Sequence, residues 1–116
     1  MQLATITLNG TLDRVILVPG FSPGEIRNVG DTVTLPSGKG LNVARTALSL
    51  GAELMTTGLV AGRCGQWICD LLKTEGIAER CVHLPCGESR ISTIIVDAES
   101  RETTVINDLG PSVPAE

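Results

Sequence analysis

Two amphipathic helical segments alternate with short β-type runs, and this order limits the fold class of the chain. Apolar residues recur at helical spacing over residues 41–50 and 66–75, while β-type runs occupy residues 3–8 and 54–60 and resume at residue 81. Strands that are joined through helices run parallel, because a tight turn can join only antiparallel strands. We therefore predict an α/β protein with a parallel-sheet core that carries helices on its faces.

Two further β-type stretches lie too close together in the sequence to be joined by helical crossovers. The first, residues 14–18, contains a continuous apolar run at 15–18, and the second, residues 26–35, is more polar and follows a Pro-Gly turn. We expect both to form a small β-flap, or lid, attached to the first strand. A turn at 98–101 joins two later β-type runs, and we expect about residues 81–107 to belong to the same lid.

The composition indicates a globular domain and excludes several classes of partner. The 116 residues are the size of one domain, and 42% of them are hydrophobic against 19% charged. No stretch approaches the ~18 apolar residues of a membrane span, and the start lacks the pattern of a signal peptide. The net charge of −4 and the presence of just two aromatic residues, Phe21 and Trp67, argue against a nucleic-acid surface. We predict a cytoplasmic protein that binds neither nucleic acid nor membranes.

Four cysteines stand in two pairs along the sequence, Cys64 with Cys69 and Cys81 with Cys86. Four intervening residues lie within the spacing that zinc sites use. However, five helical residues rotate the chain by about 140° between Cys64 and Cys69, so both thiols would not face one ion. We expect four reduced thiols that pack as small hydrophobic groups, and no metal site. The single histidine, His83, is expected on a strand surface.

A glycine-rich turn at residues 36–40 (PSGKG) opens directly into the first helix. Val33 stands where a P-loop would have its first glycine, and Val43 stands at the third glycine of a dinucleotide fingerprint, so the spacing excludes both. At such a turn the free N–H groups of the helix start, the helix dipole and the Lys39 ammonium converge on one point. The turn therefore suits an anion such as a sugar phosphate, and the alternative is a tight turn with an exposed lysine.

Four segments resemble, in the right order, the phosphofructokinase B branch of the ribokinase-like carbohydrate kinases. They are residues 7–13 (TLNGTLD), 36–45 (PSGKGLNVAR), 87–90 (GESR) and 104–111 (TVINDLGP). The resemblance covers essentially the whole chain. It implies a ribokinase-like fold, of which residues 1–116 are the N-terminal, sugar-binding part of a protein more than twice this length.

The same resemblance implies a sugar-phosphate site. Asp13 would accept hydrogen bonds from sugar hydroxyls, and Lys39 and Arg90 would hold the phosphate that the sugar already carries. Gly38 would bring the loop backbone close to the ligand, and the amide of Asn42 would reach a hydroxyl. The alternative for Asp13 is an aspartate that closes a turn at a strand end, and the alternative for Asn42 is an ordinary residue of a helix start.

The activity implied by the resemblance is ATP-dependent phosphorylation of a hexose phosphate: fructose 1-phosphate, fructose 6-phosphate or tagatose 6-phosphate. In this family the catalytic aspartate and most of the site for ATP and Mg²⁺ lie in a second glycine signature, which we expect beyond Glu116. We therefore expect no catalytic residue in this chain and no turnover by the chain alone. Two alternatives remain open: a non-catalytic sugar-phosphate-binding module that forms a homodimer through the flap, and a ribose or nucleoside kinase of the same superfamily.

Overall fold

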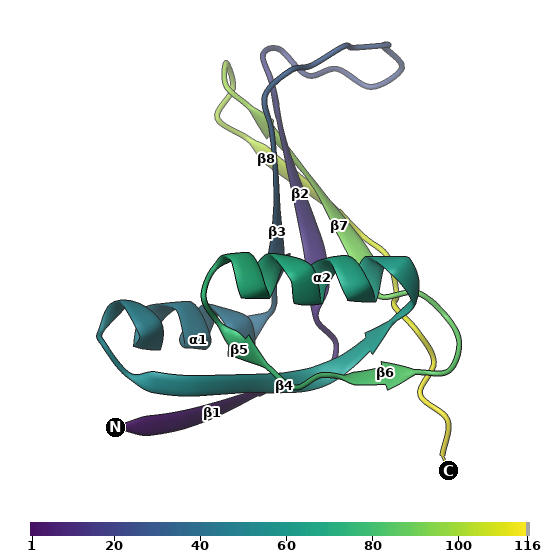
Figure 1. Cartoon of the computed structure of the whole chain (residues 1–116). Coiled ribbons are helices and arrows are strands. Elements are labelled where there is room, and N and C mark those ends of the chain that lie inside the picture. The colour runs from purple at the N-terminus through teal and green to yellow at the C-terminus, as the bar shows by residue number, and fades with distance from the viewer. Residues whose placement is uncertain (116) are drawn as a thin grey trace.

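The computed structural model describes residues 1–115, and the first of its two sheets is entirely parallel (Figure 1). β1 (Gln2–Thr7) pairs along its whole length with β4 (Glu53–Ala61). The short strands β5 (Ala78–Glu79) and β6 (Val82–Leu84) pair one after the other along the opposite edge of β4. The strand–helix–strand order of the sequence is thus realised as the predicted parallel sheet.

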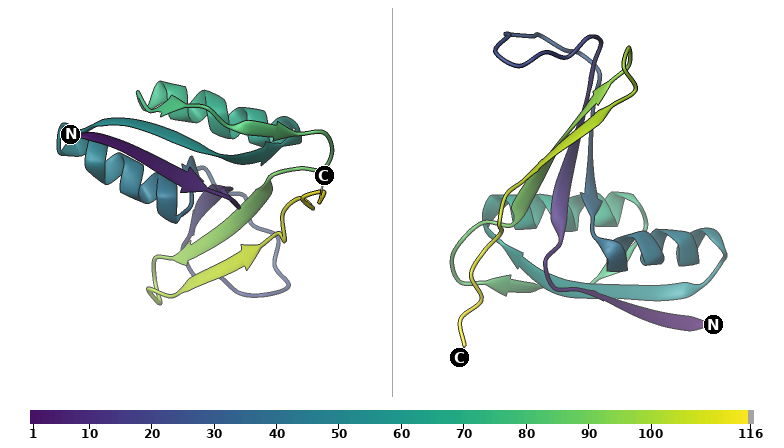
Figure 2. Two further views of the ribbon diagram at one scale, coloured as in Figure 1. Left: turned by 90° about the horizontal axis from the view of Figure 1, so that it is seen from below. Right: turned by 180° about the vertical axis from the view of Figure 1, so that it is seen from behind.

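Two helices, α1 (Lys39–Ser49) and α2 (Gly62–Thr74), pack on one face of this sheet (Figures 1 and 2). Each turns its apolar stripe toward β4, because residues three and four apart share one side of a helix. The helices begin two and four residues earlier than the apolar periodicity predicted, since their first turns are rich in glycine and polar residues. Together they enclose the buried core, which consists of Leu12, Leu41, Val60, Ile68, Cys69, Leu72 and Ile77.

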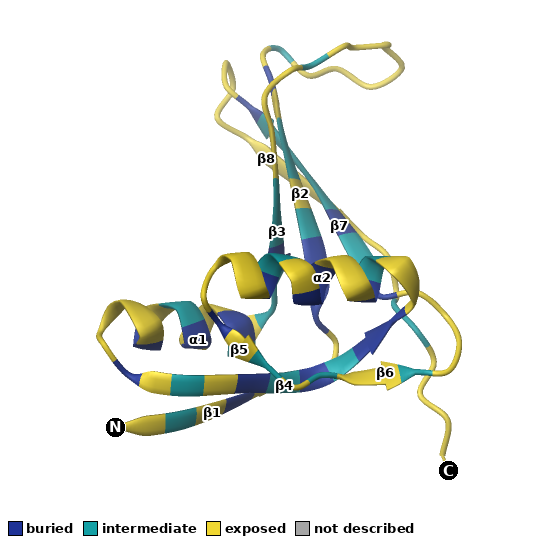
Figure 3. Ribbon diagram, viewed as in Figure 1, coloured by how far each residue is buried: buried dark blue, intermediate teal, exposed yellow. Residues whose placement is uncertain are grey.

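The other face of the first sheet is uncovered within residues 1–115. Alternate side chains of β1 and β4 point to this face, so that Ile6 is 65% exposed and Met55 is 37% exposed (Figure 3). This agrees with the expectation that two helices cover such a sheet only in part. None of the helices in the described part of the chain is long and apolar enough to cross a membrane.

The second sheet has the strand order β3-β2-β7-β8 and projects away from the first (Figure 2). It consists of β2 (Thr11–Val18), β3 (Thr32–Ser37), β7 (Arg90–Asp97) and β8 (Thr103–Asn107). The central pair, β2 and β7, is parallel, whereas the outer pairs β2–β3 and β7–β8 are antiparallel. Its base packs on the core through the buried residues Leu12 and Pro36.

Two details of this sheet differ from the sequence prediction. β6 lies in the first sheet, not with the lid segment 81–107, because the chain leaves α2 along the free edge of β4 and pairs there in parallel. Residues 26–31 form no strand, although the predicted stretch was 26–35. Arg27 instead donates hydrogen bonds to the carbonyl oxygens of Pro19 (3.0 Å) and Gly20 (2.8 Å) and holds this segment as a loop.

A buried carboxylate organises the far end of the second sheet. Asp97, at the end of β7, accepts hydrogen bonds from the backbone N–H groups of Gly20 (2.9 Å), Phe21 (3.0 Å) and Glu99 (2.9 Å). These hydrogen bonds, led by that from Glu99, lower the pKa of Asp97. The side chain thereby joins the turn after β2 to the turn between β7 and β8.

Candidate functional site

A polar hollow of about 450 Å³ lies where the carboxyl end of β1 meets the base of the second sheet. We call it the strand-end hollow; it is lined by the residues after β1, the glycine-rich turn before α1 and the start of β7. Four of the five predicted site residues line it: Gly38, Lys39, Asn42 and Arg90. The carboxyl ends of parallel strands are where ligands bind in open α/β sheets.

The glycine-rich turn presents the start of α1 to the hollow. Gly38 precedes the helix with φ 139° and ψ 155°, a conformation that side chains rarely adopt. The first turn contains no acidic residue, and its first internal hydrogen bond runs from the Asn42 N–H to the Gly38 carbonyl at 2.9 Å. The N–H groups before Asn42 have no acceptor within the helix, so this end carries partial positive charge next to Lys39.

Three glycines pack tightly around Thr7, the last residue of β1. A Cβ atom at Gly38 would lie 2.7 Å from Thr7 Cγ2, and one at Gly40 would lie 2.7 Å from the Ile6 carbonyl oxygen and against Thr7 Oγ1. A Cβ atom at Gly58 would overlap the Thr7 carbonyl oxygen. The turn and β4 can therefore approach the end of β1 only because these positions lack side chains.

Arg90 is positioned by the two residues that precede it. The Glu88 carboxylate accepts hydrogen bonds from the Arg63 and Cys64 N–H groups (3.2 and 3.0 Å) and so caps the start of α2. Ser89 exchanges two hydrogen bonds of 2.9 Å with the backbone of Ala61 at the end of β4. These anchors join the start of β7 to the first sheet and direct Arg90 toward the hollow.

The hollow is electropositive and contains polar atoms without partners. Lys39 and Arg90 line it, and none of the lining residues within the described chain is a carboxylate or a histidine. Thr7 Oγ1 and Arg90 Nε are buried and have no hydrogen-bond partner within residues 1–115. Because buried polar groups are normally paired, these atoms indicate a ligand with acceptor oxygens. Arg45, by contrast, does not line the hollow and forms an ion pair with Glu75 at 2.5 Å.

Asp13, the fifth predicted residue, is not among the residues that line the hollow. It is half-buried on β2, two residues beyond Thr11, and so projects from the same face of the second sheet. That face carries a chain of hydrogen bonds in which the Thr11 hydroxyl donates to Ser92 Oγ (3.2 Å) and Ser92 donates to Asn107 Oδ1. Asp13 therefore stands beside the hollow on a polar strip, and its part in ligand binding stays a prediction.

Sequence reasoning did not assign site roles to Thr7, Asn9 and Thr11, which also line the hollow. For Asn9 and Thr11 the sequence does offer a signal, because polar residues that follow a strand of a parallel sheet lie at its ligand-binding edge. The sequence offers no signal that the Thr7 hydroxyl lacks a hydrogen-bond partner, because this follows from the packing of the surrounding glycines.

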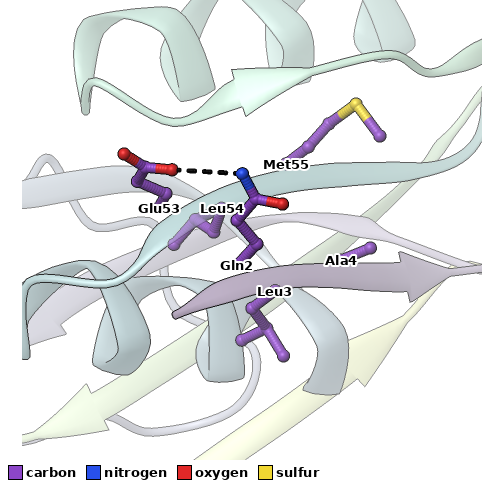
Figure 4. Close-up of a pocket in the computed structure, with 6 residues that line it drawn as sticks. All are labelled: Gln2, Leu3, Ala4, Glu53, Leu54 and Met55. Atoms are coloured by element: carbon purple, nitrogen blue, oxygen red, sulfur yellow. Dashed lines mark hydrogen bonds between the residues drawn. The ribbon is translucent and has the colours of Figure 1, made fainter.

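A second hollow, of about 410 Å³, lies along β1 and β4 on the uncovered side of the sheet (Figure 4). Its polar side chains are Gln2 and Glu53, which share a long hydrogen bond of 3.4 Å. The residues that line it include no cation, and its other members are Leu3, Ala4, Leu54 and Met55. It lacks the convergent donors of the strand-end hollow, which is therefore the candidate site.

Comparison with known proteins assigns the chain to a family. The family of pfkB carbohydrate kinases matches residues 5–116. A 1-phosphofructokinase of Xanthomonas campestris is 31% identical over 108 residues, which is 92% of this chain and 33% of that protein. A tagatose-6-phosphate kinase of Staphylococcus epidermidis is 28% identical over 112 residues, 97% of this chain and 35% of that protein. The chain thus spans about a third of the length of these curated relatives.

A solved structure confirms the fold. The crystal structure of a Thermotoga maritima protein described as a possible 1-phosphofructokinase superposes with a TM-score of 0.88 and 32% identity, covering 97% of this chain and 37% of that one. The ribokinase-like architecture expected from the motifs is therefore present in its N-terminal part. On the family match, the motif order and this superposition, the chain belongs to the pfkB family of carbohydrate kinases.

Proposed function

We propose that this chain is the sugar-phosphate-binding part of an ATP-dependent kinase that phosphorylates a hexose phosphate. Fructose 1-phosphate, fructose 6-phosphate and tagatose 6-phosphate are the candidate substrates, because the relatives are named for such sugars. The proposal depends above all on one observation. Lys39 and Arg90, which come from different elements, line one hollow together with the open start of α1 and two buried polar atoms that lack partners.

In this proposal the two cations hold the phosphate that the sugar already carries. Lys39 supplies a mobile point charge and Arg90 a planar fork whose buried Nε can bind a phosphate oxygen. The Thr7 hydroxyl and the amides of Asn9 and Asn42 are further hydrogen-bonding groups in the lining. Asp13, on the adjoining face of β2, would bind hydroxyls of the sugar ring.

ATP and Mg²⁺ are the cofactors that the proposed reaction requires. The lining of the strand-end hollow offers no carboxylate within the described residues, so it does not suit Mg²⁺, and no catalytic step is assigned to it. The hollow likewise offers no base that could take a proton from the sugar hydroxyl. We therefore propose that these residues bind and orient the sugar phosphate without transferring a phosphoryl group, and that the chain shows no ADP release above that of a Lys39→Ala/Arg90→Ala variant.

Calorimetric titration with a sugar phosphate and with its parent sugar tests the binding role. Removal of either cation should cost on the order of 1.5–3 kcal/mol of phosphate binding, about ten- to a hundredfold in Kd. Lys39→Ala and Arg90→Ala should weaken fructose 6-phosphate selectively, whereas Asp13→Ala should weaken fructose and its phosphate alike. Arg14→Ala is the matched control, because Arg14 is exposed and projects from the opposite face of β2.

The outcome for Lys39 separates the candidate functions. If Lys39→Ala weakens binding of the sugar and of its phosphate equally, the lysine does not bind the phosphate. A ribose or nucleoside kinase is then the better hypothesis. If no variant changes binding, the strand-end hollow is not the site.

We also propose that the protein forms a homodimer through the second sheet. Leu17, Val33 and Val105 are exposed on the face that carries Asp13, at 39%, 60% and 51%. Two copies of such a patch can cover each other across a twofold axis. In sedimentation experiments Val105→Lys should shift the protein toward monomer. Ile106→Lys, at a similarly exposed residue on the opposite face, should not; equal behaviour of the two variants would contradict the proposal.

A cytoplasmic location is part of the same proposal. It is supported by the four cysteines, which are all free thiols, as is usual for proteins of a reducing compartment.

A further inference from the structure

Two cysteines and a carboxylate converge at the edge of the first sheet, outside the strand-end hollow. Cys69 projects from α2, Glu79 ends β5, and Cys81 lies between β5 and β6. The two Sγ atoms and a carboxylate oxygen of Glu79 all lie within 4.8 Å of one another. Sequence spacing pairs Cys69 with Cys64, but the fold pairs it with Cys81, because the chain returns along β4 beneath α2. The helical rotation does separate Cys64, whose Sγ lies 3.8 Å from the Arg90 carbonyl oxygen.

The cluster is largely shielded from water and its carboxylate is held in place. Cys69 is 1% exposed, the Glu79 side chain is 12% exposed and Cys81 is half-buried. Glu79 Oε2 accepts a hydrogen bond from the Cys81 N–H at 3.0 Å, which fixes the carboxylate beside the thiols. Glu79 Oε1 lies 3.7 Å from Lys73 Nζ, whose side chain is 62% exposed. Access from solvent is therefore on the side of Cys81 and Lys73.

These three groups are ligands of the kind and spacing that a tetrahedral zinc ion uses. With Zn–S bonds of about 2.3 Å, two thiolates on one ion lie about 3.8 Å apart, which small side-chain rotations reach from the present arrangement. Thiolate ligands favour Zn²⁺ over Mg²⁺ or Ca²⁺, which bind through oxygen alone. Two thiolates and one carboxylate carry three negative charges, and a divalent ion with the Lys73 ammonium balances them.

We propose that Cys69, Glu79 and Cys81 bind one Zn²⁺ ion, with a water molecule as the fourth ligand. On binding, each sulfur forms a Zn–S bond and each thiol proton passes to the solvent, so that no group is oxidised or reduced. The ion would link α2 to the β5–β6 edge of the sheet, a junction that also includes the ion pair between Lys73 and Glu79. The site is independent of the proposed sugar-phosphate site, because none of its ligands lines the strand-end hollow.

Without metal both thiols of the cluster are protonated at neutral pH, so a Zn²⁺ ion must displace a proton from each. Burial and the neighbouring negative groups raise the pKa of Cys81 to about 12 and also raise the pKa of Cys69. The hydrogen bond from the backbone N–H of Cys81 lowers the pKa of Glu79.

Metal titration of the 116-residue chain tests the proposal. The chain, reduced and freed of metal with a chelator, is titrated with Zn²⁺ in competition with a chromophoric chelator, and separately with Co²⁺. We expect one equivalent of Zn²⁺ and, for Co²⁺, the near-ultraviolet absorption of cobalt–thiolate bonds. Cys81→Ser and Glu79→Gln should weaken Zn²⁺ binding at least tenfold, and Cys81→Ser should diminish the cobalt–thiolate band. Cys86→Ser, which changes an exposed thiol outside the cluster, should leave both unchanged.

Cys69→Ala affects a core residue, so far-ultraviolet circular dichroism must show it folded before its titration is read; Cys81→Ser and Glu79→Gln stand in for it otherwise. Absence of stoichiometric binding by the parent chain, or equal binding by Cys81→Ser and Cys86→Ser, overturns the proposal. A chain that takes up no Zn²⁺ but loses two hydrogens under hydrogen peroxide, with Cys69 and Cys81 in one linked peptide, also overturns it and identifies a dithiol pair.

Discussion

Substitution of Gly40 by alanine tests whether close packing around Thr7 supports the strand-end hollow. The new Cβ atom would stand 2.7 Å from the Ile6 carbonyl oxygen and against Thr7 Oγ1. Ordinary contact begins near 3.4 Å, so the start of α1 and the end of β1 must separate by about 0.7 Å. Overpacking of this kind costs about 1–3 kcal/mol, whereas alanine gains up to about 1 kcal/mol over glycine in a helix interior. We expect the cost of the clash to exceed the gain in helix propensity, because one of the atoms that must move belongs to the backbone of a paired strand.

We therefore expect Gly40→Ala to lower the free energy of unfolding by about 1–2 kcal/mol in urea denaturation and to weaken fructose 6-phosphate binding about tenfold or more. Gly30→Ala is the control, because a Cβ atom there would meet nothing within 4 Å and its φ is not positive. That variant should stay within about 0.5 kcal/mol of the parent. If Gly40→Ala is as stable as Gly30→Ala, helix propensity outweighs the contact and the packing argument fails.

Three further substitutions address the core, the α2 cap and the second sheet. Leu72→Ala, at a residue with no exposed surface, should cost about 2–5 kcal/mol by urea denaturation, against less than about 0.5 kcal/mol for Leu50→Ala at 80% exposure. Glu88→Ala removes both acceptors from the start of α2 and should cost about 1 kcal/mol, while Glu88→Gln should retain part of the cap. The lowered pKa of Asp97 means that its contribution is complete above the ordinary value of 3.8 and is lost as the pH falls further. Thermal melts between pH 2 and 6 should show this loss in the parent chain and a flatter profile in Asp97→Asn.

Local sequence patterns were sufficient to predict the helices and the parallel sheet. They did not predict the features that form where segments distant in the sequence meet. The apolar stripes of α1 and α2 identified both helices, because helical periodicity depends only on the sequence of each segment. The start of α2 was placed too late, since its first turn is capped by Glu88, which approaches from the loop before β7. β5 is only two residues long and leaves no pattern, and β6 was assigned to the wrong sheet because its partner is chosen by the return of the chain along β4.

In the candidate site, too, the sequence predicted the residues that belong to motifs but not the contacts that the fold creates. Gly38, Lys39, Asn42 and Arg90 were named from their motifs, and the fold brings all four to one hollow. The partnerless hydroxyl of Thr7 depends on glycines contributed by the turn, α1 and β4, so no local pattern predicts it. The cluster of Cys69 with Cys81 is likewise a product of the fold, and the spacing of the cysteines pointed to different pairs.

The parallel pairing of β2 with β7 has a consequence for how the chain acquires this arrangement. Thr11 is paired with Arg90, so the whole chain from β3 to β6 forms the connection between two neighbouring strands. Closing so long a loop is entropically costly and makes such a contact slow to form. At roughly 5–20 residues per second of synthesis, β2 leaves the ribosome several seconds before β7 exists. During that interval the β2–β3 hairpin has an open edge that invites mispairing. Arg90 arrives with β7, so the nascent protein gains the second cation of the strand-end hollow only when β7 docks.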